Sequence, residues 1–303
     1  MQLPHNVTIK EVGPRDGLQN EKEMIPTEDK IEWINHLSKT GLSYIEISSF
    51  VHPKWIPQLG DALEVAKGIK RNPEVTYATL VPNLKGLERA LEADVDEVSI
   101  FMSASESHNK KNINKSIDET FPVLQEVVEG AKAENKSVRG YISTVFGCPY
   151  DGQVPIENVQ KVCDQLFSMG IDELSIGDTI GVANPLQVQH VLETLSKDFP
   201  KDQLALHFHN TRGTALANVL TSLQLGFTTF DSALGGLGGC PYAKGASGNL
   251  ATDDLLYMLK EMNIKTGINQ DKLMQAGAFI QKKMDKPLPS HHMQIAYRGG
   301  DVT

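Results

Sequence analysis

The chain has 303 residues, of which 40% are hydrophobic and 22% charged, and its net charge is -9. This composition is typical of a soluble globular protein with a large core. The negative charge argues against nucleic acid as the main partner, because no basic excess is present to neutralise phosphates. No apolar run is long enough to span a bilayer, so we expect no membrane partner.

The cysteines also bear on where the protein works. The three cysteines, Cys148, Cys163 and Cys240, are widely spaced. An odd number without a paired pattern is typical of free thiols in a reducing compartment. The first residues show no basic-then-apolar signal, and we therefore expect a cytoplasmic protein.

Short apolar and β-branched runs alternate along the chain with segments of helical spacing. Eight runs predict strands, at Val7–Val12, Tyr44–Phe50, Val75–Val81, Glu97–Met102, Ser137–Val145, Glu173–Gly177, Leu204–His209 and Thr229–Ala233. The intervening segments predict helices at Thr27–Ser38, Leu59–Ile69, Leu84–Ala93, Ile117–Glu134, Ile156–Met169, Pro185–Lys197 and Ala215–Leu225. Strand–helix units in this number favour a closed (β/α)₈ TIM barrel over an open sheet. The glycine fingerprint of an open dinucleotide-binding sheet is absent at Glu11–Gly17, which reads EVGPRDG.

The last part of the chain lies beyond eight plain units. A glycine-rich stretch at Gly235–Gly248 follows the last predicted strand. Further helices are predicted near Leu250–Met262 and at Gln270–Met284. No linker divides the chain, so we expect residues 1–303 to form one catalytic barrel domain with a helical extension from about residue 250.

Polar residues gather where the predicted strands end, which is where barrels place their functional groups. These positions hold Arg15, Asp16, Glu46, Ser48, Asp178, Thr179, His207, His209, Asn210, Cys240 and Asn249. The sharpest pattern is His207-Phe208-His209, because residues i and i+2 of a strand point to the same face. Two such imidazoles can bind one metal ion together with Asp16, or they can form a hydrogen-bonded pair without metal. Two histidines, a carboxylate and an amide oxygen suit Mg²⁺, Mn²⁺ or another first-row ion.

Glu46 and Asn249 each allow two interpretations. In YIEIS, Glu46 alternates with isoleucines and should point into the barrel, where a carboxylate needs a partner such as Arg15. Glu46 could take part in catalysis directly or form a purely structural ion pair. Asn249 could bind metal or cap the following helix.

The segment GGLGGCPYAKGASGN contains six glycines in fifteen residues, with Cys240 in its middle. Such a loop can move and can bring backbone close to a ligand. Cys240 should be accessible there, unlike a core cysteine, which indicates a functional role. Lys110 and Lys111, after the fourth predicted strand, could be a solvated pair or could contact ligand phosphates.

Taken together, these residues resemble the hydroxymethylglutaryl-CoA lyase family of metal-dependent barrel lyases. The resemblance covers nearly the whole chain, and the glycine-rich cysteine segment is its most specific part. The other matching segments are VGPRDGLQNE at 12–21, IEISSFVHPKWIPQLGD at 45–61, KKNIN at 110–114, GDTIGVANP at 177–185 and HFHNTRG at 207–213. The HxH pattern alone is less specific, because it recurs in synthases of the superfamily.

The resemblance implies a role for each matching residue. Asp16, His207, His209 and Asn249 correspond to metal ligands, and Asp16 and His207 also count among the catalytic residues. Arg15 would stabilise a developing enolate or carbonyl oxygen, and Cys240 would transfer a proton. Residues expected to contact the substrate are Arg15, Glu46, Lys111, Tyr141, Asp178 and Thr179.

The implied reaction is the retro-Claisen cleavage of 3-hydroxy-3-methylglutaryl-CoA to acetyl-CoA and acetoacetate. The implied cofactor is a divalent metal, Mg²⁺ or Mn²⁺, and the implied partner is the acyl-CoA substrate. A homodimer is expected because such barrels commonly pair. Two alternatives stay open: a Claisen-type synthase or aldolase on the same barrel, and a barrel that binds acyl-CoA without catalysis.

Overall fold

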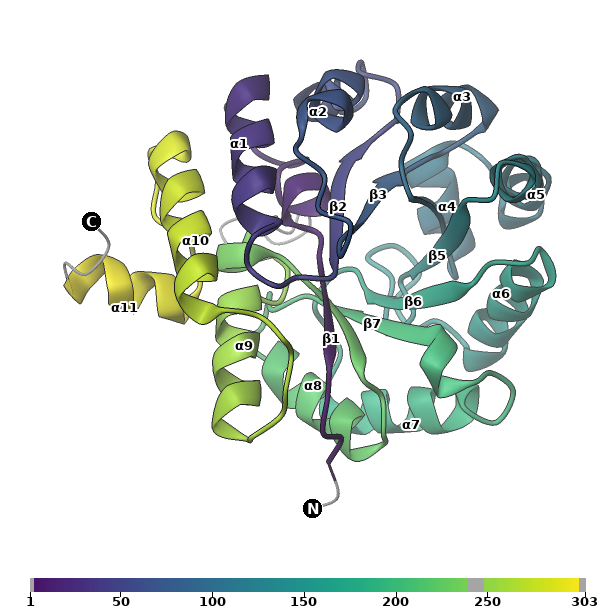
Figure 1. The fold of residues 1–303 in the computed structure, drawn as a ribbon. Helices are drawn as coiled ribbons and strands as arrows, with labels where there is room; N and C mark the ends of the chain where they lie inside the picture. The colour runs from purple at the N-terminus through teal and green to yellow at the C-terminus, as the bar shows by residue number, and fades with distance from the viewer. Residues whose placement is uncertain (1–2, 239–247, 300–303) are drawn as a thin grey trace.

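The computed structural model describes residues 3–238 and 248–299. Its eight strands form a closed parallel barrel, in which each strand pairs with the next and β8 pairs with β1. Figure 1 shows the strands at the centre and the helices around them. The predicted TIM barrel with additional C-terminal helices is confirmed.

The elements follow one another along the chain as strand and helix. The strands are β1 (Thr8–Glu11), β2 (Tyr44–Ser49), β3 (Thr76–Leu80), β4 (Glu97–Ser103), β5 (Ser137–Ser143), β6 (Glu173–Asp178), β7 (Leu204–Phe208) and β8 (Thr229–Ser232). The helices are α1 (Thr27–Leu37), α2 (Ala62–Gly68), α3 (Leu84–Glu92), α4 (Glu106–Ile113), α5 (Ile117–Ala133), α6 (Ile156–Ser168), α7 (Pro185–Leu195), α8 (Ala215–Gln224), α9 (Thr252–Glu261), α10 (Gln270–Met284) and α11 (His291–Gly299). All but α4 and α11 coincide closely with predicted segments.

The barrel strands are buried on both faces, as expected of parallel strands covered by helices. In β2, Ile45 and Ile47 join the hydrophobic core, and Glu46 between them is completely buried. Successive strand residues point to opposite faces, so Glu46 points into the barrel. The YIEIS alternation therefore predicted the orientation of this carboxylate correctly.

Two helices were not predicted from the sequence. Helix α4 has the polar sequence ESHNKKNI, which lacks an apolar stripe, and its start is stabilised by Ser105, whose hydroxyl accepts a hydrogen bond from the His108 backbone N–H at 3.2 Å. Helix α11 is anchored from a distance: the Asp254 carboxylate accepts the backbone N–H groups of His291 and His292 at 3.1 and 2.9 Å. These partners are 37 and 38 residues apart in the sequence, so no local pattern predicts where α11 begins.

The C-terminal helices pack together on one side of the barrel, where α10 contacts α1 (Figure 1). Among the described residues, none of the helices combines the length and apolar character needed to cross a membrane.

A buried carboxylate, Glu11, ties three segments together beneath the rim of the barrel. It accepts hydrogen bonds from the backbone N–H groups of Gly13 and Leu234 at 2.8 and 2.9 Å and from the Thr252 hydroxyl at 2.7 Å. Burial raises the pKa of Glu11 to about 7, against the lowering effect of these hydrogen bonds. Glu11 thereby fixes the ends of β1 and β8 and the start of α9 relative to one another.

Candidate metal centre and substrate cavity

Asp16, His207 and His209 converge at the carboxyl ends of β1 and β7. One potential ligand atom from each lies within 4.8 Å of the other two, and all three residues are buried. His207 Nε2 lies 3.8 Å from Asp16 Oδ2 and 3.2 Å from His209 Nε2. The two imidazoles therefore face the same point, as the strand alternation predicted.

Asp16 is placed by a tight π-helical turn, Gly13–Gly17, that follows β1 directly. The turn is closed by backbone hydrogen bonds, including one from the Asp16 N–H to the Val12 carbonyl at 2.7 Å. Burial opposes ionisation of Asp16, but Arg15 and the two histidines outweigh it and lower the pKa of this carboxyl. Asp16 therefore presents a carboxylate at neutral pH.

Asn249 completes the group of converging side chains. Its Nδ2 donates to Asp16 Oδ2 at 2.7 Å and to the Leu237 carbonyl at 3.0 Å. Its Oδ1 is buried and has no hydrogen-bond partner within residues 3–238 and 248–299. The helix-capping alternative for Asn249 is wrong, because Ala251 is the N-cap residue of α9 and Asn249 instead forms an isolated β-bridge with His209.

These donors fit a divalent cation. The set consists of a carboxylate oxygen, two imidazole nitrogens and a buried amide oxygen that has no other partner among the described residues. Burial and the neighbouring His207 lower the pKa of His209 to about 4, so its imidazole is neutral and can act as a ligand. Oxygen and imidazole donors without thiolates suit Mg²⁺, Mn²⁺ or a related ion better than structural zinc.

Arg15 lies beside this group and is held on two sides. Its Nε donates to Glu46 Oε2 and its Nη1 to Asp16 Oδ1, both at 2.6 Å. The Tyr141 hydroxyl also donates to Glu46 Oε2, at 3.1 Å. The predicted partnership of Arg15 and Glu46 is therefore confirmed as a buried ion pair, and Tyr141 belongs to the same network.

Asp178 is the last residue of β6, and Thr179 follows it. Thr179 lines the cavity, whereas Asp178 is buried and is not among the described residues that line it. The Asp178 carboxylate accepts the backbone N–H groups of Val182 and Ala183 at 2.9 and 3.1 Å, which organises the loop after the strand. Burial raises the pKa of Asp178 to about 6, although these hydrogen bonds lower it in part. Thr179 lies on the wall of the cavity, and its hydroxyl accepts the Thr144 N–H at 2.8 Å.

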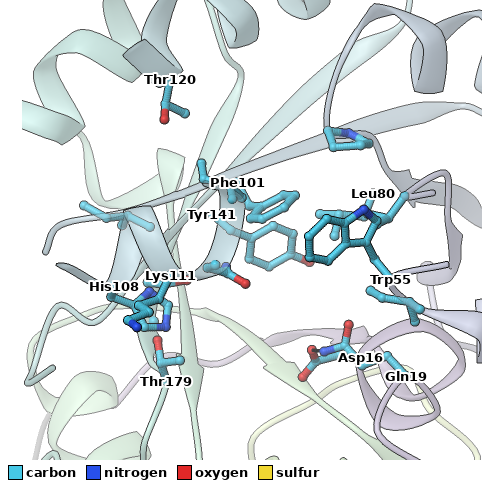
Figure 2. Close-up of a pocket in the computed structure, with 18 of the residues that line it drawn as sticks. Asp16, Gln19, Trp55, Leu80, Phe101, His108, Lys111, Thr120, Tyr141 and Thr179 are labelled. Carbon is cyan, nitrogen blue, oxygen red and sulfur yellow. Dashed lines mark hydrogen bonds between the residues drawn. The ribbon is translucent and has the colours of Figure 1, made fainter. Parts of the chain in front are cut away.

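A cavity of about 1040 Å³ opens in front of these residues. Figure 2 shows Asp16 on one side of it and His108, Lys111 and Thr179 on the other, with Tyr141 between them. Lys111 is exposed and belongs to helix α4, which contributes to the cavity wall. A cavity of this size can hold a large ligand whose reactive end reaches Asp16.

Cys240 lies outside the described residues. The described chain reaches Gly238, which lines the cavity and has a φ of +95°. A Cβ atom there would lie 2.6 Å from Asn249 Nδ2 and 3.1 Å from the Asp16 carbonyl oxygen. Only glycine permits this close approach, so the chain lies against the site at Gly238, two residues before Cys240 in the sequence.

The sequence analysis missed a buried polar network beneath the site, formed by Arg139, Ser175 and Asp231. Arg139 and Asp231 are completely buried and form an ion pair at 2.6 Å. A charged residue at an inward position of a buried strand, as in SVRGYIS and TFDS, is the signal that could have revealed both. Their pairing could not be read from the sequence, because it joins strands 92 residues apart.

Comparison with known proteins agrees with this geometry. The HMGL-like family matches residues 6–280. The chain is 62% identical over 295 residues to the hydroxymethylglutaryl-CoA lyase YngG of Bacillus subtilis, covering 97% of this chain and 99% of that protein. It is 51% identical to the mitochondrial hydroxymethylglutaryl-CoA lyase of Homo sapiens, covering 95% of this chain and 89% of that protein.

Solved structures are similar over the same length. The crystal structure of the Bacillus subtilis HMG-CoA lyase superposes with a TM-score of 0.97 at 61% identity, covering 98% of this chain and 100% of that chain. An HMG-CoA lyase from Acinetobacter baumannii, in complex with coenzyme A and 3-methylmalate, has a TM-score of 0.92 at 41% identity and covers 96% of this chain and 95% of that chain. The chain belongs to the HMGL-like family, and the relatives named here are hydroxymethylglutaryl-CoA lyases.

Proposed function

We propose that this protein is a divalent-metal-dependent lyase that cleaves 3-hydroxy-3-methylglutaryl-CoA to acetyl-CoA and acetoacetate. The observation that carries the proposal is the convergence of Asp16, His207 and His209 beside Arg15 at the end of the cavity. The near full-length similarity to hydroxymethylglutaryl-CoA lyases supports the choice of substrate.

The reaction makes definite demands on the site. The tertiary hydroxyl at C3 loses its proton, the C2–C3 bond breaks, and its electron pair passes into the enolate of the acetyl thioester. The oxygen at C3 becomes the ketone of acetoacetate, and the enolate carbon takes up a proton to give acetyl-CoA. The site must therefore accept one proton, stabilise an enolate and deliver one proton.

We assign metal binding to Asp16, His207, His209 and Asn249. A divalent cation held by these residues would lower the pKa of the substrate hydroxyl. Mg²⁺ and Mn²⁺ both suit the donor set, and we propose that either one supports activity.

Arg15 supplies a fixed positive charge for the developing enolate oxygen. Its guanidinium is buried, and Glu46 and Asp16 hold it in place before substrate arrives. A charge that is already oriented needs no reorganisation during the reaction, and it acts strongly where water is excluded. Tyr141 supports Glu46 by a hydrogen bond and lines the cavity.

Proton transfer requires groups that lie beside the substrate position and can accept or donate a proton. We assign acceptance of the C3 hydroxyl proton to the carboxylate or imidazole beside the metal position, Asp16 or His207, both of which line the cavity. We assign the proton donor for the enolate to Cys240, whose thiol belongs to the segment that begins beside the site at Gly238.

The rest of the cavity suits the CoA part of the substrate. Lys110, Lys111 and Lys115 line it, and they bring positive charge to a protein whose net charge is -9. CoA carries several phosphate charges, which these ammonium groups can neutralise. Thr179 on the same wall offers a hydroxyl to the substrate.

Product analysis tests the proposed activity. Incubation of the metal-loaded protein with 3-hydroxy-3-methylglutaryl-CoA should yield acetyl-CoA and acetoacetate in equal amounts. Release of free CoA from acetyl-CoA and a 2-oxo acid, without acetoacetate from the hydroxyacyl-CoA, would identify a synthase instead. Binding of the hydroxyacyl-CoA without turnover in the presence of metal would identify a non-catalytic barrel.

We also propose a cytoplasmic homodimer. The proposal rests on the composition of the sequence and on the frequency of twofold pairing among such enzymes. Light scattering coupled to size-exclusion chromatography should give twice the mass of 33.3 kDa that the chain has.

A further inference from the structure

In the described part of the barrel, the buried carboxylate of Asp231 contacts the predicted metal ligand His207 on the side of the ring away from Asp16 and His209. It lies on β8, directly opposite His207 of β7 in the strand register. His207 Nδ1 lies 3.2 Å from Asp231 Oδ2, while His207 Nε2 points to Asp16 and His209. The two ring nitrogens therefore face different partners.

The surroundings of Asp231 determine which of its hydrogen bonds are possible. Arg139 Nη2 donates to Asp231 Oδ1 at 2.6 Å, and the Ser175 hydroxyl donates to Oδ2 at 2.7 Å. A carboxylate paired with an arginine is ionised and can only accept hydrogen bonds. The contact with His207 therefore requires a proton on Nδ1, which leaves the lone pair of a neutral imidazole on Nε2.

We infer that Asp231, oriented by Arg139 and Ser175, is a positioning residue that fixes His207 in the tautomer whose Nε2 is free to bind metal. The inference rests on the metal site of the proposed function. Outer partners of this kind orient a ligand and fix its tautomer, and their loss typically weakens metal binding by about 10- to 100-fold.

His209 differs from His207 in this respect. Its Nδ1 is buried and has no hydrogen-bond partner in the described parts of the chain. With its lone pair on Nε2, His207 can only accept in the 3.2 Å contact between the two Nε2 atoms, so His209 donates there. In protein without metal we therefore expect opposite tautomers, Nδ1–H in His207 and Nε2–H in His209.

The matched variants are Asp231→Asn and Glu173→Gln. Asparagine keeps the shape of Asp231, but its amide can donate to Nδ1 and so favours the wrong tautomer of His207. Glu173 is the other acidic partner of Arg139, at 2.6 Å, and it lies on β6 without contacting His207. Each variant removes one negative charge that pairs with Arg139, but only Asp231 contacts a predicted metal ligand.

The readout is Mn²⁺ affinity of the metal-free protein, measured by calorimetry for the wild type, Asp231→Asn, Glu173→Gln and His207→Ala. Asp231→Asn should weaken binding by about 10- to 100-fold, and Glu173→Gln should change it by less than about threefold. Unchanged affinity in Asp231→Asn, or an equal loss in Glu173→Gln, would overturn the inference while leaving the metal site in place. Unchanged affinity in His207→Ala would overturn the proposed metal site itself.

Nitrogen NMR of the wild type tests the tautomer without any change in the barrel core. Protein labelled with ¹⁵N-histidine is measured free of metal at pH 8, and the His207 signal is assigned by its loss in His207→Ala. A protonated Nδ1 on His207 supports the inference, and a protonated Nε2 overturns it. This readout also holds if Asp231→Asn does not fold.

Discussion

Two charged regions share the interior of the barrel, one at its floor and one at its carboxyl rim. At the floor, Glu173 Oε1 accepts from Lys10 Nζ at 2.8 Å and from Arg139 Nε at 2.6 Å. Each charge in this group has an opposite charge as its partner. Such pairs offset the cost of burying charge, and they leave few unpaired polar atoms that could bind a ligand.

The rim has a different balance. Asp16, His207 and His209 direct potential metal-ligand atoms to one point, and the buried Oδ1 of Asn249 has no partner among the described residues. Arg15 lies beside them and lines the cavity. Converging metal-ligand atoms, rather than the number of buried charges, identify the functional end of this barrel.

The largest difference between the two regions should appear when one charge is removed from each. Asp16→Ala should lower acetoacetate formation by at least about 10³-fold and Mn²⁺ affinity by more than the roughly 100-fold effect of an outer partner. Lys10→Met should lower the free energy of unfolding by about 1–3 kcal/mol and leave Mn²⁺ affinity unchanged. Calorimetric titration and chemical unfolding of both variants measure these effects. An equal loss of Mn²⁺ affinity in Asp16→Ala and Lys10→Met would contradict the distinction between the rim and the floor of the barrel.

Cys240→Ala should affect the rim without affecting its metal ligands. Loss of the enolate proton donor should lower kcat by about 10²- to 10⁴-fold, while the metal content stays at the wild-type value. Cys163→Ala is the control, because Cys163 is buried on α6 away from the site. Loss of metal in Cys240→Ala would mean that the thiol is a ligand and not a proton donor.

Arg15→Lys keeps the positive charge but loses the geometry that Glu46 and Asp16 impose on the guanidinium. Because a single ammonium cannot make the same directed contacts, kcat should fall by about 10²- to 10³-fold. Metal content and KM should change little in steady-state assays. A wild-type kcat would show that Arg15 acts as a simple counter-ion.

Lys111 should give the smallest effect, because it is exposed and its charge is screened. Lys111→Ala should raise KM for the acyl-CoA by about two- to fivefold, less at high salt, with kcat unchanged. Lys197→Ala is the matched control, since Lys197 is exposed and does not line the cavity. Equal KM values for the two variants would remove Lys111 from the binding site.

Local patterns in the sequence predicted much of this structure. The alternation in YIEIS and HFH placed Glu46, His207 and His209 inside the barrel, because strand geometry fixes side-chain direction. The glycine-rich segment indicated that backbone could come close to a ligand, and Gly238 lies against Asn249 and Asp16 at the site. Long-range contacts were not visible: Asp231 meets Arg139 only when the barrel closes, and α11 begins where Asp254 reaches it.

One measurement tests the central claim most directly: acetoacetate formed from 3-hydroxy-3-methylglutaryl-CoA, before chelation, after chelation and after addition of Mg²⁺ or Mn²⁺. We expect product before chelation, none in EDTA-treated protein, and recovery with either ion. Full activity in protein shown to be free of metal would contradict the assignment of the converging Asp16, His207 and His209 as a metal centre.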